Sequence, residues 1–164
     1  MDQNIWEYDD FIFKGDELKG MTAKGKDKVK AGGQTDLVIP AVTPDGLPLK
    51  KIADNAFYRR GLTSVVIPDT VESIGYDAFG VCKLKEVKLP EALVNIEGFA
   101  FYRNKLTKVE FGSKVKRIEP SAFAMNELSE ITLPETLEYI GASAFYKNAF
   151  ETITFPKALT KIDM

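Results

Sequence analysis

The stretch IGYDAFGVCKLKEVKLP, residues 74–90, is one of five versions of a single sequence frame. Each version begins 22 residues after the one before it, and aligning them places apolar residues in columns. One column contains Ile52, Ile74, Ile96, Ile118 and Ile140, with Ile162 opening a sixth frame. Another contains Phe57, Phe79, Phe101, Phe123 and Phe145. A frame that keeps its apolar positions through five copies predicts five copies of one structural unit.

A repeat of this length predicts a leucine-rich-repeat solenoid, of the α/β superhelix class but here mostly strands and turns. Val87, Lys88 and Leu89 alternate apolar, polar and apolar, as a strand with one buried face does. Because successive coils run in the same direction, we expect these strands to form a parallel sheet on one face. The segments 71–74 and 92–96 predict a second, narrower strand on the opposite wall, and each Ala-Phe corner predicts a tight or 3₁₀ turn.

The predicted organisation is a capping segment at residues 1–36 followed by a solenoid at 37–164. Within the solenoid, residues 37–51 form a degenerate first coil, five full repeats run from residue 52, and a sixth starts at 162. One coil buries too little to fold alone, so coils depend on their neighbours and the ends need caps.

The stretch IWEYDDFIF, residues 5–13, predicts a β-hairpin cap that turns at Asp9-Asp10, with Trp6 lying over the first coil. No comparable cap follows Ile162. An open apolar coil there predicts either a longer chain or end-to-end self-association with another copy.

The composition excludes several function classes. The 22 basic and 24 acidic residues give a net charge of −2, which argues against a nucleic-acid partner. Histidine is absent, which removes Ser-His-Asp and Cys-His nucleophiles and every histidine-ligated metal site. No apolar run is long enough to span a membrane. We therefore expect no catalytic residues, no metal and no cofactor, and thus no enzyme.

The start of the chain carries acidic residues where a signal peptide has a basic end and an apolar run. The chain is therefore expected to be either intracellular or a mature fragment without its leader. Its single cysteine, Cys82, aligns with Asn104, Asn126 and Asn148. This alignment favours a structural role over a reactive thiol: the asparagines satisfy backbone groups in the turn, and Cys82 is a small apolar substitute.

The frame resembles the BspA-like, treponemal-type leucine-rich repeats, whose unit is written roughly LxxVxIPxxVxxIGxxAFxxC, with Cys or Asn last. The resemblance covers about residues 35–164, and the family's glycine is kept at Gly75 and Gly141 but replaced in the other frames. It implies a bacterial protein that is usually on the cell surface or secreted, and that adheres to host matrix proteins or other cells. A cytoplasmic location stays open.

Two surfaces are candidate binding sites. The first is the outer face of the predicted sheet, where the candidate residues are Glu86, Lys88, Lys108, Glu110 and Glu130. Opposite charges lie side by side on neighbouring strands, and such pairs fix register for roughly 0.2–1 kcal/mol each. The alternative is a solvated face without a ligand.

The second surface is an edge where a tyrosine precedes a basic residue in every second frame. The pairs are Tyr58-Arg59, Tyr102-Arg103 and Tyr146-Lys147. Spaced aromatic rings beside cations suit a sugar chain or an anionic wall polymer. The alternative is that each tyrosine covers the phenylalanine column next to a small residue of the following frame.

A cluster of lysines precedes the solenoid. Lys24, Lys26, Lys28 and Lys30 share one face if the segment is extended, which suits acidic lipid or teichoic acid. The alternative is that the charges protect an edge strand from aggregation.

These features predict a non-catalytic binding or adhesion module of a bacterial surface protein. Its partner would be an unidentified protein, or a cell-wall or host glycan, recognised through the sheet face or the tyrosine edge. The alternative function is a structural spacer or assembly segment of a longer surface protein.

Overall fold

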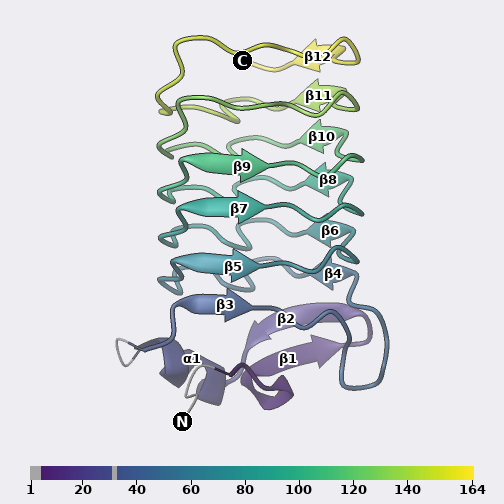
Figure 1. Ribbon diagram of the computed structural model, residues 1–164, viewed down its shortest axis with the longest axis vertical. Coiled ribbons are helices and arrows are strands. Elements are labelled where there is room, and N and C mark those ends of the chain that lie inside the picture. The colour runs from purple at the N-terminus through teal and green to yellow at the C-terminus, as the bar shows by residue number, and fades with distance from the viewer. Residues whose placement is uncertain (1–4, 31–32) are drawn as a thin grey trace.

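The computed structural model describes residues 5–30 and 33–164. Successive coils stack along one axis, with the N-terminal segment at one end and the C-terminus at the other (Figure 1). Equivalent residues of neighbouring coils pair 22 positions apart, as Ile52 does with Ile74. The predicted solenoid of 22-residue coils is confirmed.

One wall of the solenoid, here called the isoleucine wall, carries a continuous sheet. Within the described residues its eight strands run in the order β1-β2-β4-β6-β8-β10-β11-β12. From β4 onward each strand has two residues, ends on a column isoleucine and pairs in parallel with its neighbour. These strands are β4 (Lys51–Ile52), β6 (Ser73–Ile74), β8 (Asn95–Ile96), β10 (Arg117–Ile118), β11 (Tyr139–Ile140) and β12 (Lys161–Ile162).

The opposite wall, here called the front wall, carries the strands predicted from the alternating triplets. They are β3 (Asp36–Val38), β5 (Ser64–Val66), β7 (Glu86–Lys88) and β9 (Lys108–Glu110), each with a buried centre and exposed flanks. In residues 33–164 they pair only as β3 with β5 and β7 with β9, and no strand forms at 130–132 or 152–154.

Within the described residues the front triplets pair in parallel, as predicted, but only in two separate pairs, and the continuous sheet lies on the narrower wall. On the isoleucine wall the same side chain recurs in every coil, which keeps the coils evenly spaced. Behind the front wall one column mixes Leu89, Phe111 and Leu133. This mixture does not decide which front strands pair, because Phe111, which follows the paired strand β9, has a leucine in both neighbouring coils.

The corners between the walls hold the phenylalanine column. Rings of successive coils stack with centroids 5.2–5.7 Å apart and planes within 13° of parallel. The corners are turns, as predicted, and each contains two non-glycine residues with positive φ, such as Asp77 and Val81, both at 54°. Alternate corner N–H groups donate to the next coil, as Phe79 N does to Ala100 O at 2.9 Å.

The N-terminal cap contains η1 (Tyr8–Asp10), β1 (Phe11–Lys14), β2 (Glu17–Met21) and α1 (Ala23–Lys30). The predicted hairpin is present, but β1 and β2 turn at Gly15-Asp16 and not at Asp9-Asp10, which lie in η1. Gly15 has φ +59°, a conformation that glycine adopts without steric cost. Strand β2 pairs in parallel with β4 and so extends the isoleucine wall.

Of two further predictions about the cap, the one for Trp6 is confirmed and the one for the lysine segment is wrong. Trp6 packs on the core and its Nε1 donates to the Asp36 carbonyl of β3 at 2.7 Å, so it lies against the first coil as expected. The lysine segment is a helix, so the prediction of an extended basic face is wrong. Thr22 caps this helix by accepting from the Gly25 N–H at 3.3 Å.

Candidate functional site

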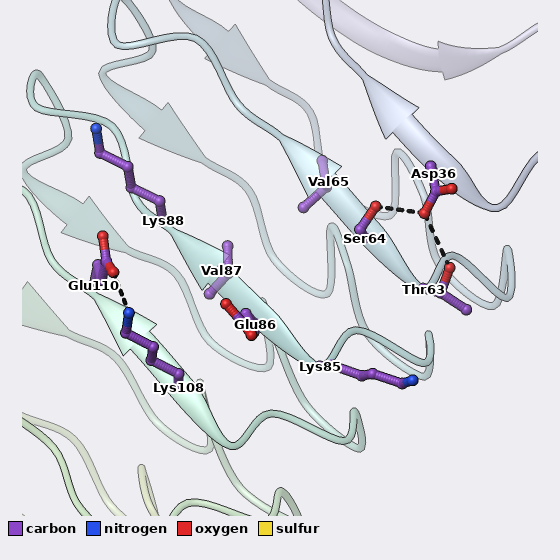
Figure 2. A pocket seen from close by; sticks show the side chains of 10 residues that line it. All are labelled: Asp36, Thr63, Ser64, Val65, Lys85, Glu86, Val87, Lys88, Lys108 and Glu110. Carbon is purple, nitrogen blue, oxygen red and sulfur yellow. Dashed lines mark hydrogen bonds and ion pairs between the residues drawn. The ribbon is translucent and has the colours of Figure 1, made fainter. Parts of the chain in front are cut away.

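A groove on the front wall contains four of the predicted sheet-face residues. It has a volume of about 450 Å³ and lies across β5 and β7, which are not paired with each other. Figure 2 shows the side chains of Glu86, Lys88, Lys108 and Glu110 along it, with Asp36 at its other side. We call it the first front groove.

The charges of the first front groove are only partly neutralised. Glu86 lies opposite Lys108 and Lys88 opposite Glu110, as predicted. Lys108, however, pairs with Glu110 of its own strand at 2.5 Å, which raises the pKa of Lys108 and lowers that of Glu110. In the described part of the chain neither Glu86 nor Lys88 forms an ion pair, so both charges remain available to a ligand.

A second front groove, of about 930 Å³, lies on the other side of β9. It contains Glu130, the fifth predicted residue, and its walls include Phe111 and Ile131. No backbone hydrogen bond joins residues 107–112 to 129–134 within the described ranges. The two grooves therefore flank β9, and backbone groups on the second groove's side of β9 lack a neighbouring strand.

The tyrosine edge stays a set of separate pairs. The Arg59 guanidinium lies 5.2 Å from the Tyr58 ring centroid, and the Lys147 ammonium lies 5.6 Å from that of Tyr146. Tyr102 instead makes an edge contact with Phe99 at 5.2 Å. Arg59, Arg103 and Lys147 occupy positive-φ corner positions and are exposed. None of the six edge residues lines either front groove.

A polar network on the isoleucine wall was not predicted. The Arg117 guanidinium lies 4.0 Å from the Tyr139 ring centroid, and the Tyr139 hydroxyl donates to Asp163 at 2.7 Å. This hydrogen bond raises the pKa of Tyr139 and lowers that of Asp163. Arginine and tyrosine each occur only once in this outward column, so periodicity gave no signal for the network; its position before each column isoleucine was the available clue.

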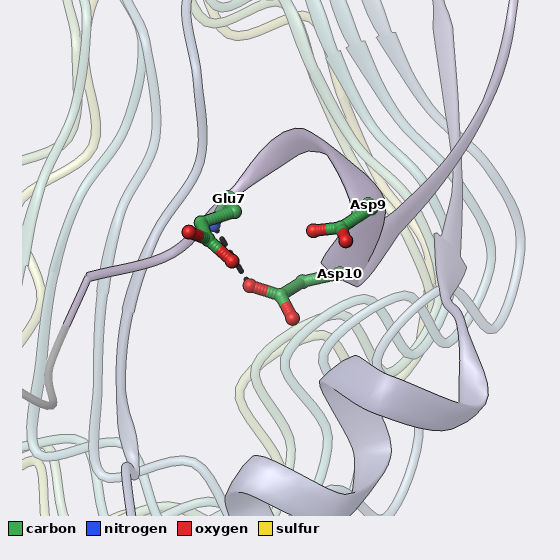
Figure 3. A group of neighbouring side chains, drawn as sticks. All are labelled: Glu7, Asp9 and Asp10. Carbon is green, nitrogen blue, oxygen red and sulfur yellow. Dashed lines mark hydrogen bonds between the residues drawn. The ribbon is translucent and has the colours of Figure 1, made fainter.

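An acidic cluster in the cap, Glu7, Asp9 and Asp10, brings three carboxylates within 4.8 Å of one another (Figure 3). Lys24 bonds to Glu7 at 2.5 Å and to Asp9 at 2.8 Å, and Lys28 bonds to the buried Asp10 at 2.5 Å. In Figure 3 the second oxygen of Asp10 points away from the other two carboxylates. Two lysines thus pair with the three carboxylates and tie η1 to α1, which is a structural role.

The Cys/Asn column has the predicted structural role. Asn104 accepts from the Leu84 N–H at 3.0 Å and donates to the carbonyls of Phe79 and Phe101 at 2.9 and 3.1 Å. Cys82 is buried, and its thiol donates to the Phe57 carbonyl at 3.2 Å. Burial raises the pKa of the Cys82 thiol and so disfavours the nucleophilic thiolate. The column therefore joins successive coils through hydrogen bonds and offers no nucleophile.

The repeat frame matches a known family. The model of the BspA type leucine rich repeat region matches six copies over residues 50–164. The chain belongs to this family. The resemblance predicted from the frame is therefore confirmed, and no curated protein matches the chain significantly.

Three solved structures are similar to the fold. A Treponema pallidum leucine-rich-repeat protein (TpLRR) matches with a TM-score of 0.76 at 24% identity, over 94% of this chain and 79% of its own. A Bacteroides ovatus leucine-rich-repeat protein matches with a TM-score of 0.59 at 19% identity, over 98% and 55%. The pneumococcal vaccine antigen PcpA matches with a TM-score of 0.53 at 25% identity, over 92% and 37%. The chain thus spans about half or less of the last two.

Membership of this family indicates a repeat module of bacterial surface proteins. Among the described residues, no helix has the length and apolar character needed to cross a bilayer.

Proposed function

We propose that this chain is the ligand-binding module of a bacterial surface protein and that it recognises a protein through the front wall. The observation that carries the proposal is the pair of grooves on either side of β9, because they gather all five predicted sheet-face residues.

The chemistry of the grooves favours a protein ligand. Glu86 and Lys88 offer opposite charges in the first groove, and electrostatic complementarity of this kind fixes the orientation of a protein partner. The second groove offers apolar surface from Phe111 and Ile131 beside backbone that lacks a neighbouring strand. An extended segment of a partner can hydrogen-bond to such backbone by adding a strand.

A glycan fits the grooves less well, because Phe111 is the only aromatic residue among the described residues that line them. The tyrosines lie in the corners instead. The proposed location is the cell surface or the secreted fraction, which follows from the family.

A binding screen tests this function. The immobilised chain is presented with a panel of host matrix proteins and purified wall polymers, and binding is measured by surface plasmon resonance. We expect a protein to bind, and Lys88→Glu to weaken binding at least about tenfold because it reverses a groove charge. The matched control is Lys83→Glu, which reverses an exposed charge outside both grooves and is expected to leave affinity unchanged.

The triple variant Tyr58→Ala, Tyr102→Ala, Tyr146→Ala separates the two predicted surfaces. Retained affinity in this variant supports the front wall. Loss of binding in the triple variant, with full affinity in Lys88→Glu, would move the site to the tyrosine edge and refute the proposal. Binding to wall polymers alone would refute the protein ligand.

A further inference from the structure

The second front groove carries a surplus of negative charge. Among the described residues that line it, four are acidic and one is basic: Glu91, Glu110, Glu130, Glu135 and Lys108. The first front groove differs, because three acidic and three basic residues line it. The surplus therefore belongs to the second groove and not to the front wall as a whole.

Two of the four carboxylates are already engaged within the chain. Glu110 pairs with Lys108, and Glu91 accepts from the N–H and from the hydroxyl of Ser113, both at 3.1 Å. The other two, Glu130 and Glu135, are exposed, and no ion pair or hydrogen bond from the described part of the chain reaches their carboxylates. These two negative charges remain available to a cationic ligand.

Apolar surface lies beside these charges. Phe111 and Ile131 line the groove, and both pack on the core while staying half-buried, so part of each side chain faces the groove. Lysine and arginine side chains can lie with their apolar stems on such surface while their charged ends reach a carboxylate. The groove therefore suits a ligand that has both basic and apolar side chains.

The groove crosses several coils of the stack. Glu91 belongs to one coil, residues 107–113 to the next, and residues 130–136 to the one after that. Figure 1 shows β9 inside the stack, with coils on both sides of it. A groove lined by three successive coils fits a chain segment of several residues better than a single side chain.

We propose that the second front groove binds a basic segment of a partner protein, in which lysine or arginine alternates with apolar residues. This inference rests on the proposed front-wall function and names the chemistry of its partner. The cationic side chains pair with Glu130 and Glu135, and the apolar side chains contact Phe111 and Ile131. An acidic segment is rejected, because like charges placed together in an interface repel one another.

Isothermal titration of the full chain with synthetic peptides tests the proposal. The first peptide alternates valine and lysine over about seven residues, the second has glutamate in place of lysine, and the third has serine in place of valine. We expect the first to bind with a dissociation constant below about 1 mM in about 50 mM salt. About 500 mM salt should weaken it at least about tenfold. The second should not bind, and the third should bind at least about tenfold more weakly.

A double variant locates the binding in the groove. Glu130→Gln combined with Glu135→Gln removes both unpaired charges and no contact within the chain, so the fold is retained. It is expected to weaken binding of the valine–lysine peptide at least about tenfold. The matched control is Glu127→Gln, because Glu127 is an exposed glutamate of the same coil that lines neither groove. This control should leave affinity unchanged.

Four results would overturn the proposal. They are no binding of the valine–lysine peptide, equal binding of its glutamate counterpart, unchanged affinity in the double variant, and an equal loss in Glu127→Gln. Any of these, alongside a protein ligand that Lys88→Glu weakens, would remove the basic segment and leave the front-wall function standing. A screen in which no protein binds would contradict the front-wall function itself. The peptide titrations need no identified partner and still decide the charge preference of the groove.

Discussion

Replacing Asn126 with alanine tests the hydrogen-bonded column that joins the corners of successive coils. The Asn126 side chain is 7% exposed and makes three hydrogen bonds to backbone groups. It accepts from the Leu106 N–H at 3.0 Å and donates to the carbonyls of Phe101 and Phe123 at 2.9 and 3.0 Å. Alanine removes all three bonds without changing the backbone conformation that a turn requires.

The expected cost follows from what each backbone group loses. Each hydrogen bond contributes about 1 kcal/mol net, and a buried donor left without a partner costs about 1–3 kcal/mol. The Leu106 N–H loses its acceptor, whereas the Phe101 carbonyl keeps a bond from Asn104 at 3.1 Å. We expect Asn126→Ala to lower the free energy of unfolding by about 3–4 kcal/mol. That loss is a large fraction of the roughly 5–15 kcal/mol typical of a folded protein.

Urea unfolding followed by circular dichroism measures this change. The matched control is Asn95→Ala, because Asn95 is half-buried on the isoleucine wall and its side chain makes no hydrogen bond within the described residues. The control is expected to change the free energy of unfolding by less than about 0.5 kcal/mol. A loss in Asn126→Ala within about 1 kcal/mol of the control would refute the role of the column.

Three further substitutions and one labelling experiment have defined outcomes. Phe101→Ala empties the middle of the ring stack and is expected to cost about 3–5 kcal/mol in urea unfolding. Val81→Asn is expected to add about 0.5–1 kcal/mol in the same assay, because a β-branched residue at φ 54° is strained and asparagine tolerates that conformation. Burial raises the pKa of Glu97 above 4.5, so its ionisation opposes folding; Glu97→Gln should raise the urea midpoint at pH 7 and leave it unchanged well below pH 4.5. Cys82 should react with a thiol reagent only as fast as the chain opens, and rapid labelling of the native protein would contradict its burial.

The sequence predicted those features in which every coil repeats the same residue type. Columns of isoleucine, phenylalanine and asparagine each have one preferred environment, so their stacking follows from the period alone. The structure confirms the ring stack and the asparagine bonds. The alternation of buried and exposed residues in the front strands is also confirmed, because it depends only on strand geometry.

Pairing along the front wall was not predictable from the strands themselves. Val87, Val109 and Ile131 are equivalent residues, yet only the first two lie in paired strands. Phe111 has a leucine in both neighbouring coils, Leu89 and Leu133, so the residues behind the wall do not predict on which side β9 pairs. Period and alternation contain no information about the distance between coils, so the two grooves could not be located in advance.

The cap was predicted in kind but not in detail. Asp9-Asp10 has turn-forming residues, but the hairpin turns where Gly15 supplies positive φ. Lysines at every second position fit a helix as well as a strand. Contacts distant in sequence, such as Lys28 with Asp10, then stabilise the helix. Such tertiary contacts decide the structure of short segments whose local preferences are weak.

The candidate site, like the cap, was predictable from the sequence only in part. Charged residues at the flanks of a strand centre had to face outward, so Glu86 and Lys88 were correctly placed on the sheet face. The tyrosine pairs recur at every second coil and so remain separated along the stack, which the spacing itself implied. The network around Tyr139 depends on Arg117 and Asp163, whose residue types occur at the equivalent position of no other coil, so it left no periodic signal.

Contacts between successive phenylalanine rings test the stacked-coil account most directly. A nuclear Overhauser spectrum of the chain, with labelled phenylalanine rings, should show contacts between Phe79 and Phe101 and between Phe101 and Phe123, whose centroids are each 5.4 Å apart. It should show none between Phe79 and Phe123, which are separated by a full coil. Absence of the two neighbouring contacts, or a direct contact between Phe79 and Phe123, would contradict the account.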